Sequence, residues 1–562
     1  MSKKPRAFSF STTPTIKMSR TKMPLSYGRT MSASLGDLHL MYFEEVLPGD
    51  TFKCKSKIIS RLTSAFLKPA FANIFLDTYY FFVPARLVCD HWKNIFGENT
   101  DGAWANTQSY EVPAIPIGIG KDLVGTVYDD FELPIFDTAP SGTELPLISV
   151  LPFRCNALVY NEWFRDQNYI QPMDISKGDV TSNEVINTNA WSVTNYTGKL
   201  PKVSKYHDYF TSVLPSPQKG SAVDVLTGVD SNPFLPLRAN GQNFADLEGY
   251  MRVNLGASTT PLDYNLKING GSPNVAGGRG TVYSQPLNSG GSDVYGTPVT
   301  ATNLGVANPI TTGLTVNDLR LAFQTQKMLE KDAMYGTRYV EYLLGHFGVS
   351  SPDARLQRPE FLGGRRLNIG ISQVAQTSAS TDGQSLGGLA GYSLSDGVTG
   401  FSKGFTEHGF ILGYCVYRQF HSYQQSLDKR FTRFKRLDFY DPVFANIGNQ
   451  PVMQSQIYAL APKDNVFGYQ EAWADYRYHP NTVTGQMRSV AENSLDIWHL
   501  ADEYTSAPVA SKEFLTETPN YLDRAIAVDS DVQDQFILDI WHDVEAVRVM
   551  PLHSVPGLID HH

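Results

Sequence analysis

Residues 51–58 read TFKCKSKI, and their strict alternation decides the fold class. Small and apolar residues occupy one set of alternate positions, whereas threonine and three lysines occupy the other. A period of two is typical of a β-strand with one face in a core and the other in solvent. The turn Pro48-Gly49-Asp50 and the run 38–46 precede it. The sequence therefore predicts two early strands, the second with a lysine face.

The same pattern returns near the C-terminus, within residues 535–548. The alternating residues are Phe536, Leu538, Ile540 and Val544 on one side and Asp539, Trp541, Asp543 and Glu545 on the other. Strong strands at the two ends of a chain, with long excursions between them, fit a Greek-key sandwich in which early and late strands pair. We expect the strands near 38–59 and 535–548 to lie in one sandwich.

The composition favours one large β domain with long insertions and a few short helices. Of 562 residues, 42% are hydrophobic and 12% aromatic, enough for a large core, and no charge-rich or Ser/Pro-rich hinge divides the chain. The clearest helix begins at a capping box, Thr315-x-x-Asp318, and stops at Gly336, with a second short helix ending at Gly345. Shorter helices are predicted within 88–97 and 152–164.

Residues 254–316 hold eleven glycines and only four charged residues. Loops of this length are usually functional or disordered, and this composition offers little from which to build a core. The stretch therefore reads as an insertion displayed by a scaffold, within a longer insertion over 221–316. A second Gly/Ser-rich insertion is expected at 376–408.

The first 36 residues form an expected basic arm, followed by one large domain at 37–562. The arm carries seven cations and no acid, which leaves −16 for the remainder of a chain whose net charge is −9. This asymmetry suggests a polyanion partner, although a solubilising or merely disordered tail would have the same composition.

A second cationic segment reads KRFTRFKR at residues 429–436. Its basic residues could bind phosphates while Phe431 and Phe434 stack on unpaired bases. If the segment is a strand, however, the cluster is split between two faces. The alternative places the aromatic rings in the core and the basic residues in solvent or in ion pairs between subunits.

The chemistry-bearing residues favour neither an enzyme nor a metal site, and no cofactor is expected. The four cysteines, 54, 89, 155 and 415, lie far apart without zinc spacing and read as buried thiols. Neighbouring acids such as Asp129-Asp130 point to opposite faces on a strand and cannot share a substrate. No phosphate loop, HExxH or GxSxG motif occurs, and neither a signal peptide nor a membrane span is expected.

Several longer blocks resemble one viral family. They are EEVLPGDTF at 44–52, FLDTYYFFVPARLVCDHWKNIFGE at 75–98, LPFRCNALVYNEWFRDQN at 151–168, KYHDYFTSVLPSPQKG at 205–220, NDLRLAFQTQKMLEKDAMYGTRYVEYLLGHFGVSSPDARLQRPEFLGG at 317–364, VFGYQEAWADYRYHPNTVTGQMRS at 466–489, SLDIWHLAD at 494–502 and PGLIDH at 556–561. In this order they resemble the major capsid protein of the gokushovirus branch of the microviruses (Microviridae), small bacteriophages with circular single-stranded DNA. The resemblance covers most of the chain from residue 44, but neither the basic arm nor 221–316.

The resemblance implies a single viral jelly roll and a T=1 icosahedral shell of sixty copies enclosing single-stranded DNA. It also implies a virion location after assembly in the host cytoplasm, a homo-oligomeric state, and small basic DNA-binding, scaffolding and pilot proteins as partners. The family's variable insertion, thought to form protrusions at the three-fold axes, would correspond to 221–316 and meet a bacterial surface receptor.

These expectations define two sets of candidate residues. Expected to contact DNA are Lys3, Lys4, Arg6, Lys17, Arg20, Lys22, Arg29, Arg430, Arg433, Lys435 and Arg436. Expected in the host-attachment protrusion are Asn254, Tyr264, Arg279, Tyr283, Tyr295 and Val316. The competing class is a carbohydrate-binding or glycan-cleaving β-sandwich protein, which would also be rich in aromatic residues and loops.

Overall fold

The computed structural model describes residues 19–553 apart from 72, 99–109, 141, 143, 222, 224–263, 270–280, 287–315 and 379–385. The chain divides into two units, one formed by Met1–Ser221 with Lys327–His562 and the other by Ala222–Gln326. The first unit contains the sandwich, and the second contains β8 (Tyr264–Asn269) and β9 (Thr281–Pro286).

The sandwich is built from four antiparallel strand pairs nested along the chain. From the innermost pair outward they are β5 (Ile74–Pro84) with β10 (Glu360–Asn368), β4 (Thr51–Leu62) with β12 (Leu389–Gly404), β3 (His39–Val46) with β13 (Gly409–Gln419), and β2 (Tyr27–Ala33) with β18 (Phe536–Arg548). Two further pairings, β18 with β4 and β13 with β5, join these pairs into two sheets.

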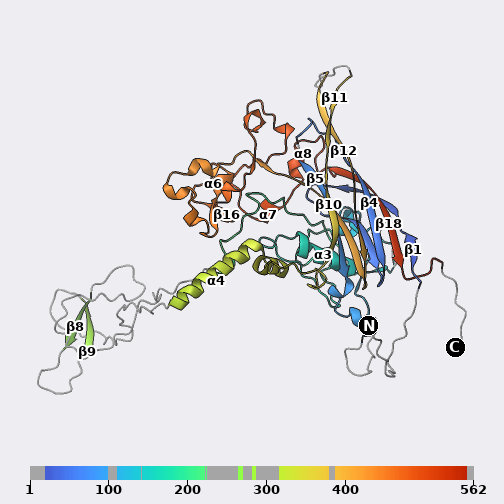
Figure 1. Cartoon of the computed structure of the whole chain (residues 1–562), viewed down its shortest axis with the longest axis horizontal. Helices are drawn as coiled ribbons and strands as arrows, with labels where there is room; N and C mark the ends of the chain where they lie inside the picture. Colours follow the sequence, from blue (N-terminus) through green and yellow to red (C-terminus); the bar gives the residue numbers. More distant parts are fainter. Residues whose placement is uncertain are drawn as a thin grey trace, which may run out of the picture. The chain divides into compact units, whose positions relative to one another are not determined.

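The resulting strand orders are those of a jelly roll. One sheet has the order β2-β18-β4-β12 and the other β3-β13-β5-β10, with β1 (Thr21–Pro24) and β11 (Ile371–Ala375) added at the edges of the first. Figure 1 shows β1, β18, β4 and β12 side by side. An eight-stranded double sheet of this topology is the jelly roll of viral capsid domains. The predicted fold class is confirmed, as is the shared sandwich of the early and late strands.

The alternation seen in the sequence is what fills the core. Every second residue of β4, from Phe52 to Leu62, is buried. Across the sandwich the rings of Tyr417 on β13 and Phe536 on β18 stack with centroids 3.8 Å apart. Strand β13 is buried at nearly every position, because α3 (Leu151–Val159) and neighbouring loops cover its second face. Its sequence is therefore apolar without alternation.

A buried charge cluster fastens the long excursion after β13 to the rest of the unit. His421 places Nδ1 2.7 Å from Oδ1 of Asp502 and Nε2 3.1 Å from Oε2 of Glu517. Lys205 Nζ lies 3.5 Å from Asp502 Oδ2 and donates to the Tyr521 hydroxyl at 2.8 Å. All four charged side chains are buried. Burial opposes the imidazolium, but Glu517 and Asp502 together raise the pKa of His421 to about 9.

The predicted helices are present, with one boundary corrected. Helix α4 (Val316–Tyr335) stops before Gly336, whose φ of +101° suits glycine, while Thr315 of the expected capping box lies outside the described residues. The second helix, α5 (Tyr339–Tyr342) with η5 (Leu343–Phe347), does not end at Gly345. It ends at Gly348, the next glycine, which has a left-handed φ of +68°. Segments 88–97 and 152–164 contain α1 (Trp92–Ile95), α3 and η3 (Tyr160–Phe164).

The expected insertion at 376–408 is wrong for most of its length. Residues 389–404 form β12, which pairs with β4 through eleven positions in the interior of the sheet. Its glycines serve close packing: a Cβ at Gly400 would lie 2.2 Å from the Cys54 carbonyl oxygen, and one at Gly397 would lie 2.6 Å from Leu367. Residues 405–408 connect β12 to β13, and residues 379–385, between β11 and β12, lie outside the described part of the chain.

The remaining α-helices and strands are short. They are α2 (Val127–Asp130), α6 (Gln454–Ile457), α7 (Lys512–Leu515), α8 (Asn520–Asp523), β6 (Ala114–Pro116), β7 (Leu147–Ser149), β8 (Tyr264–Asn269), β9 (Thr281–Pro286), β14 (Ser422–Tyr423), β15 (Gln450–Met453), β16 (Val466–Gln470) and β17 (Asn481–Thr482). The four cysteines are free and buried, as predicted. Within the described residues, no helix is both long and apolar enough to span a bilayer.

Candidate assembly and nucleic-acid surfaces

The expected basic arm is shorter than its sequence boundary. Residues 21–33, assigned to the arm, form β1 and β2 at the edge of the sandwich, where both pair with β18. The expected boundary at residue 36 is therefore wrong. The two strands were missed because apolar and polar residues alternate only weakly in their sequences, and because their partner strand lies about five hundred residues away. Candidates Lys3, Lys4, Arg6 and Lys17 lie outside the described residues.

Two cations of the expected arm form ion pairs with acids of the folded domain. Arg29 is 10% exposed and donates to the Asp130 carbonyl oxygen at 2.8 Å and to Glu132 at 3.1 Å. Lys22 reaches Glu545 at 2.6 Å on the solvent side of the sheet. Arg29 is thus committed to an internal ion pair and is not available as a phosphate contact, whereas Lys22 remains largely exposed.

The KRFTRFKR segment is not a strand, so the division of its residues between two faces does not arise. It begins with a single turn, η6 (Lys429–Thr432), capped by Asp428, whose carboxylate also binds Arg430 at 2.6 Å. Arg433 forms an ion pair with Asp475, and its guanidinium lies 4.1 Å from the ring centroid of Tyr476. Arg430 and Arg433 are therefore already paired within the chain.

The aromatic residues of this segment point outward. Phe431 is 74% exposed and Phe434 is 84% exposed, so the interpretation that placed them in the core is wrong. Among the described residues, Lys435 and Arg436 have no ion-pair partner. Burial and the charge of Arg433 lower the pKa of Lys429. Two exposed rings beside two unpaired cations form the aromatic-basic turn, a suitable surface for unpaired bases and phosphates.

A second exposed surface is apolar and helical. On α5 and η5, Tyr339 is 65% exposed, Leu344 58% and Phe347 66%. Helical spacing places Leu319, Ala322, Phe323 and Leu329 on one face of α4. In this chain no residue of α4 is buried, and Phe323 is 64% exposed. The helical apolar face is defined here as Tyr339, Leu344 and Phe347. The recorded ring contacts of Tyr339 and Phe347 are with Tyr342 of the same helical segment, and all three side chains remain largely exposed.

A third exposed surface follows the aromatic-basic turn. Six large apolar residues within 437–447 are at least 36% exposed: Leu437, Phe439, Tyr440, Val443, Phe444 and Ile447. Sequence inspection did not single out this run, whose density of apolar residues was the available signal. Because large exposed apolar patches are typical of interaction sites, this run is a candidate protein interface.

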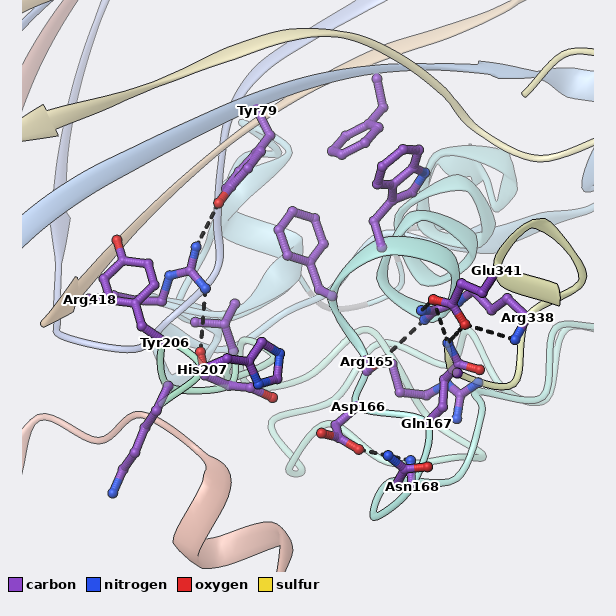
Figure 2. A pocket seen from close by; sticks show the side chains of 17 residues that line it. Tyr79, Arg165, Asp166, Gln167, Asn168, Tyr206, His207, Arg338, Glu341 and Arg418 are labelled. Atoms are coloured by element: carbon purple, nitrogen blue, oxygen red, sulfur yellow. Dashed lines mark hydrogen bonds and ion pairs between the residues drawn. The ribbon is translucent and has the colours of Figure 1, made fainter. Parts of the chain in front are cut away.

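A cavity of about 350 Å³ lies where β5 and β13 meet η3 and α5. Figure 2 shows Arg418 near Tyr79 and Tyr206 on one side, and Arg338 with Glu341 and Gln167 on the other. Arg418 donates to the Tyr79 hydroxyl at 2.6 Å, and Gln167 donates to Glu341 at 3.2 Å. Burial raises the pKa of the adjoining Asp77, but Arg366 and Arg418 together hold that pKa below its ordinary value. Several charged groups of the lining are thus paired with each other, whereas Nε of Arg165, Arg338 and Arg418 is buried without a hydrogen-bond partner among the described residues.

The expected protrusion falls largely outside the described residues. Asn254, Arg279 and Tyr295 are among those not described, whereas Tyr264 lies on β8 and Tyr283 on β9, two strands that pair antiparallel. Val316 is the first residue of α4 and is 66% exposed.

Comparison with known proteins adds an independent line of evidence. Residues 11–558 match the family model described as capsid protein (F protein). Relatives include capsid protein VP1 of Bdellovibrio phage phiMH2K, 36% identical over 98% of this chain and 97% of the relative. Capsid protein VP1 of Chlamydia phage 1 is 35% identical over 98% and 97% of the two chains. VP1 of Spiroplasma virus 4 is 35% identical over 96% and 95%.

Proposed function

Because this chain belongs to the capsid protein (F protein) family of bacteriophages, we propose that sixty copies of it form a T=1 icosahedral shell around circular single-stranded DNA. The chain is a structural capsid subunit of the virion, and its copies assemble into a shell. The triangulation number, the single-stranded DNA genome, assembly in the host cytoplasm and the contact with the host surface are proposed for this chain.

The observation that carries the proposal is the apolar surface that a single chain leaves exposed on a jelly roll. The helical apolar face and the run 437–447 occupy different segments, so neighbouring copies can contact each other through unlike surfaces. Contacts between unlike surfaces generate rings and, with several of them, closed shells. Obligate interfaces of this kind bury about 2,000–5,000 Å².

The proposed DNA contacts are the cations before β1 and the aromatic-basic turn. Five cations precede the sandwich: Lys3, Lys4, Arg6, Lys17 and Arg20. The turn adds Phe431, Phe434, Lys435 and Arg436 as a stacking and phosphate-binding surface. Small basic DNA-binding, scaffolding and pilot proteins are the proposed assembly partners.

A symmetry-averaged map of DNA-filled particles tests these statements together. We expect sixty equivalent subunits, with nucleotide density against Phe431 or Phe434 and the chain before β1 on the same inner surface. A shell with another copy number would refute the T=1 proposal. Density for DNA elsewhere, with the aromatic-basic turn buried between subunits, would refute the proposed contact at that turn.

We further propose that the insertion binds the host surface, because loops carry recognition while the scaffold carries stability. Replacing residues 264–308 with a short glycine linker should leave particle yield nearly unchanged. The free-energy cost of closing a loop changes by only about 0.6 kcal/mol for each doubling of the loop's length. Adsorption of the variant particles to host cells should fall at least tenfold.

A control with a glycine linker of the deleted length separates lost contacts from lost length. Variant particles that adsorb normally would exclude a receptor role for the deleted residues. Failure of both variants to assemble would instead identify the insertion as a clamp between subunits.

A further inference from the structure

The outer face of the sheet formed by β2, β18, β4 and β12 carries a row of cations. Lys53, Lys55 and Lys57 alternate with buried residues along β4, so all three project from the solvent face. Within the described residues none of them forms an ion pair, although Glu545 and Asp543 lie directly opposite Lys53 and Lys55 on β18.

Those two acids are engaged elsewhere. Glu545 binds Lys22 at 2.6 Å, and Asp543 accepts a hydrogen bond from the Ser26 hydroxyl at 3.3 Å. The face around 53–57 therefore holds four lysines against two carboxylates. The excess of positive charge is localised on β4, whereas Asp539 and Asp396 flank Ile59, one row further on.

A tryptophan lies in the same face. Trp541 of β18 is directly opposite Lys57, and residues opposite each other on antiparallel strands have Cβ atoms about 4.5–5.5 Å apart. On its other side Trp541 is opposite Gly28 of β2, where a Cβ would lie 3.4 Å from Cε3 of the indole. The glycine lets the ring lie against the β2 backbone, and the side chain remains 50% exposed.

We propose that this face, the lysine-tryptophan face, binds single-stranded DNA through Lys53, Lys55, Lys57 and Trp541. Side chains two residues apart on a strand are about 6.8 Å apart, which is close to the separation of successive phosphates in an extended single strand. A cationic track beside an exposed indole provides the two components of sequence-independent binding, charge for the backbone and a ring for a base.

The inference rests on the proposed DNA-enclosing function and adds an orientation to it. If this face meets the genome, the sheet containing β4 and β18 must form the inner side of the sandwich in the shell. Sequence inspection recognised the lysine face, but the position of Trp541 opposite Lys57 required the register between β4 and β18.

The test uses dissociated full-length chain and a bromodeoxyuridine-substituted oligothymidylate of 20 nucleotides. Changing Lys53, Lys55 and Lys57 to glutamine should reduce the salt slope of log K by about 2, from roughly 0.7 per phosphate contact. Trp541→Ala should weaken binding about 5- to 150-fold, from ~1–3 kcal/mol per stacked base, and Trp541→Phe should restore most of it. Photocrosslinking of the unmodified chain should map to Trp541.

Matched variants make each result specific. Lys121, Lys463 and Lys512 are exposed elsewhere on the chain, and changing them to glutamine removes the same charge but should leave the slope unchanged. Inorganic polyphosphate has no bases. Its binding should therefore weaken in the lysine variant and stay unchanged in Trp541→Ala.

The outcomes separate this inference from the function on which it rests. Unmodified chain that binds no oligonucleotide, even at low salt, would contradict the DNA-enclosing function itself. Tight binding with an equal slope in both lysine variants would overturn only the lysine-tryptophan face. The inference would also be overturned if the lysine variant bound DNA normally but failed to assemble, which would assign the face to a second copy of the chain.

Discussion

Replacing Asp502 with asparagine is expected to lower the free energy of unfolding of the subunit by about 3–5 kcal/mol. The carboxylate lies between two cations, with His421 Nδ1 at 2.7 Å and Lys205 Nζ at 3.5 Å. The substitution leaves both cations buried with only Glu517 to balance them. An uncompensated buried charge is among the few single changes that cost this much.

The same cluster predicts how stability depends on pH. The pKa of His421 is raised in the folded chain from 6.5 to about 9. Its contribution of about 3 kcal/mol is therefore complete below pH 6.5 and is lost as the pH rises towards 9. Asp502 has a lowered pKa, so its own contribution is present at neutral pH and is lost in acid. Subunit stability should thus decline between pH 6.5 and 9, and Asp502→Asn should flatten that decline.

Urea unfolding of dissociated subunits at several pH values measures both effects. The matched control is Glu545→Gln, which removes the exposed partner of Lys22 and should cost no more than about 1 kcal/mol. Equal effects of the two substitutions, or an unchanged pH profile in Asp502→Asn, would show that the cluster does not hold the excursion in place.

The fold was predictable wherever one strand face is buried and the other is not. The alternation in β4 and β18 specifies a half-buried strand from local sequence alone, and both strands occur where predicted. Strand β12 was missed because Gly397 and Gly400 resemble loop residues. Their role depends on Leu367 and Cys54, which are distant in sequence, so no local pattern reveals it.

The candidate sites were less predictable because charge pairing is long-range. Arg29 and Arg433 belong to basic clusters in the sequence, yet their partners are Glu132 and Asp475, 103 and 42 residues away. Composition identifies how many cations a segment has. Only the fold determines which cations are already neutralised, and hence which remain for a polyanion.

Substituting aspartate at Leu344 and Phe347 together is expected to abolish shell formation while leaving the subunit folded. The two side chains are 58% and 66% exposed in the single chain, so neither contributes much to its core. Surface substitutions away from special features usually change stability by less than about 0.5 kcal/mol. If neighbouring copies cover the helical apolar face, however, each aspartate is buried without a partner at a cost of several kcal/mol.

This cost recurs in every copy, because each subunit of a symmetric shell presents the same face. A contact weakened by about 4 kcal/mol has its equilibrium constant lowered roughly 1,000-fold, at a factor of ten for each 1.4 kcal/mol. Sedimentation velocity and electron microscopy should then show subunits or small oligomers, with near-ultraviolet circular dichroism unchanged. The control, Leu344→Met with Phe347→Leu, keeps the face apolar and should still yield shells. Normal shells from the aspartate variant would mean that the helical apolar face lies outside every subunit contact, so the contacts that close the shell would have to be sought at residues 437–447.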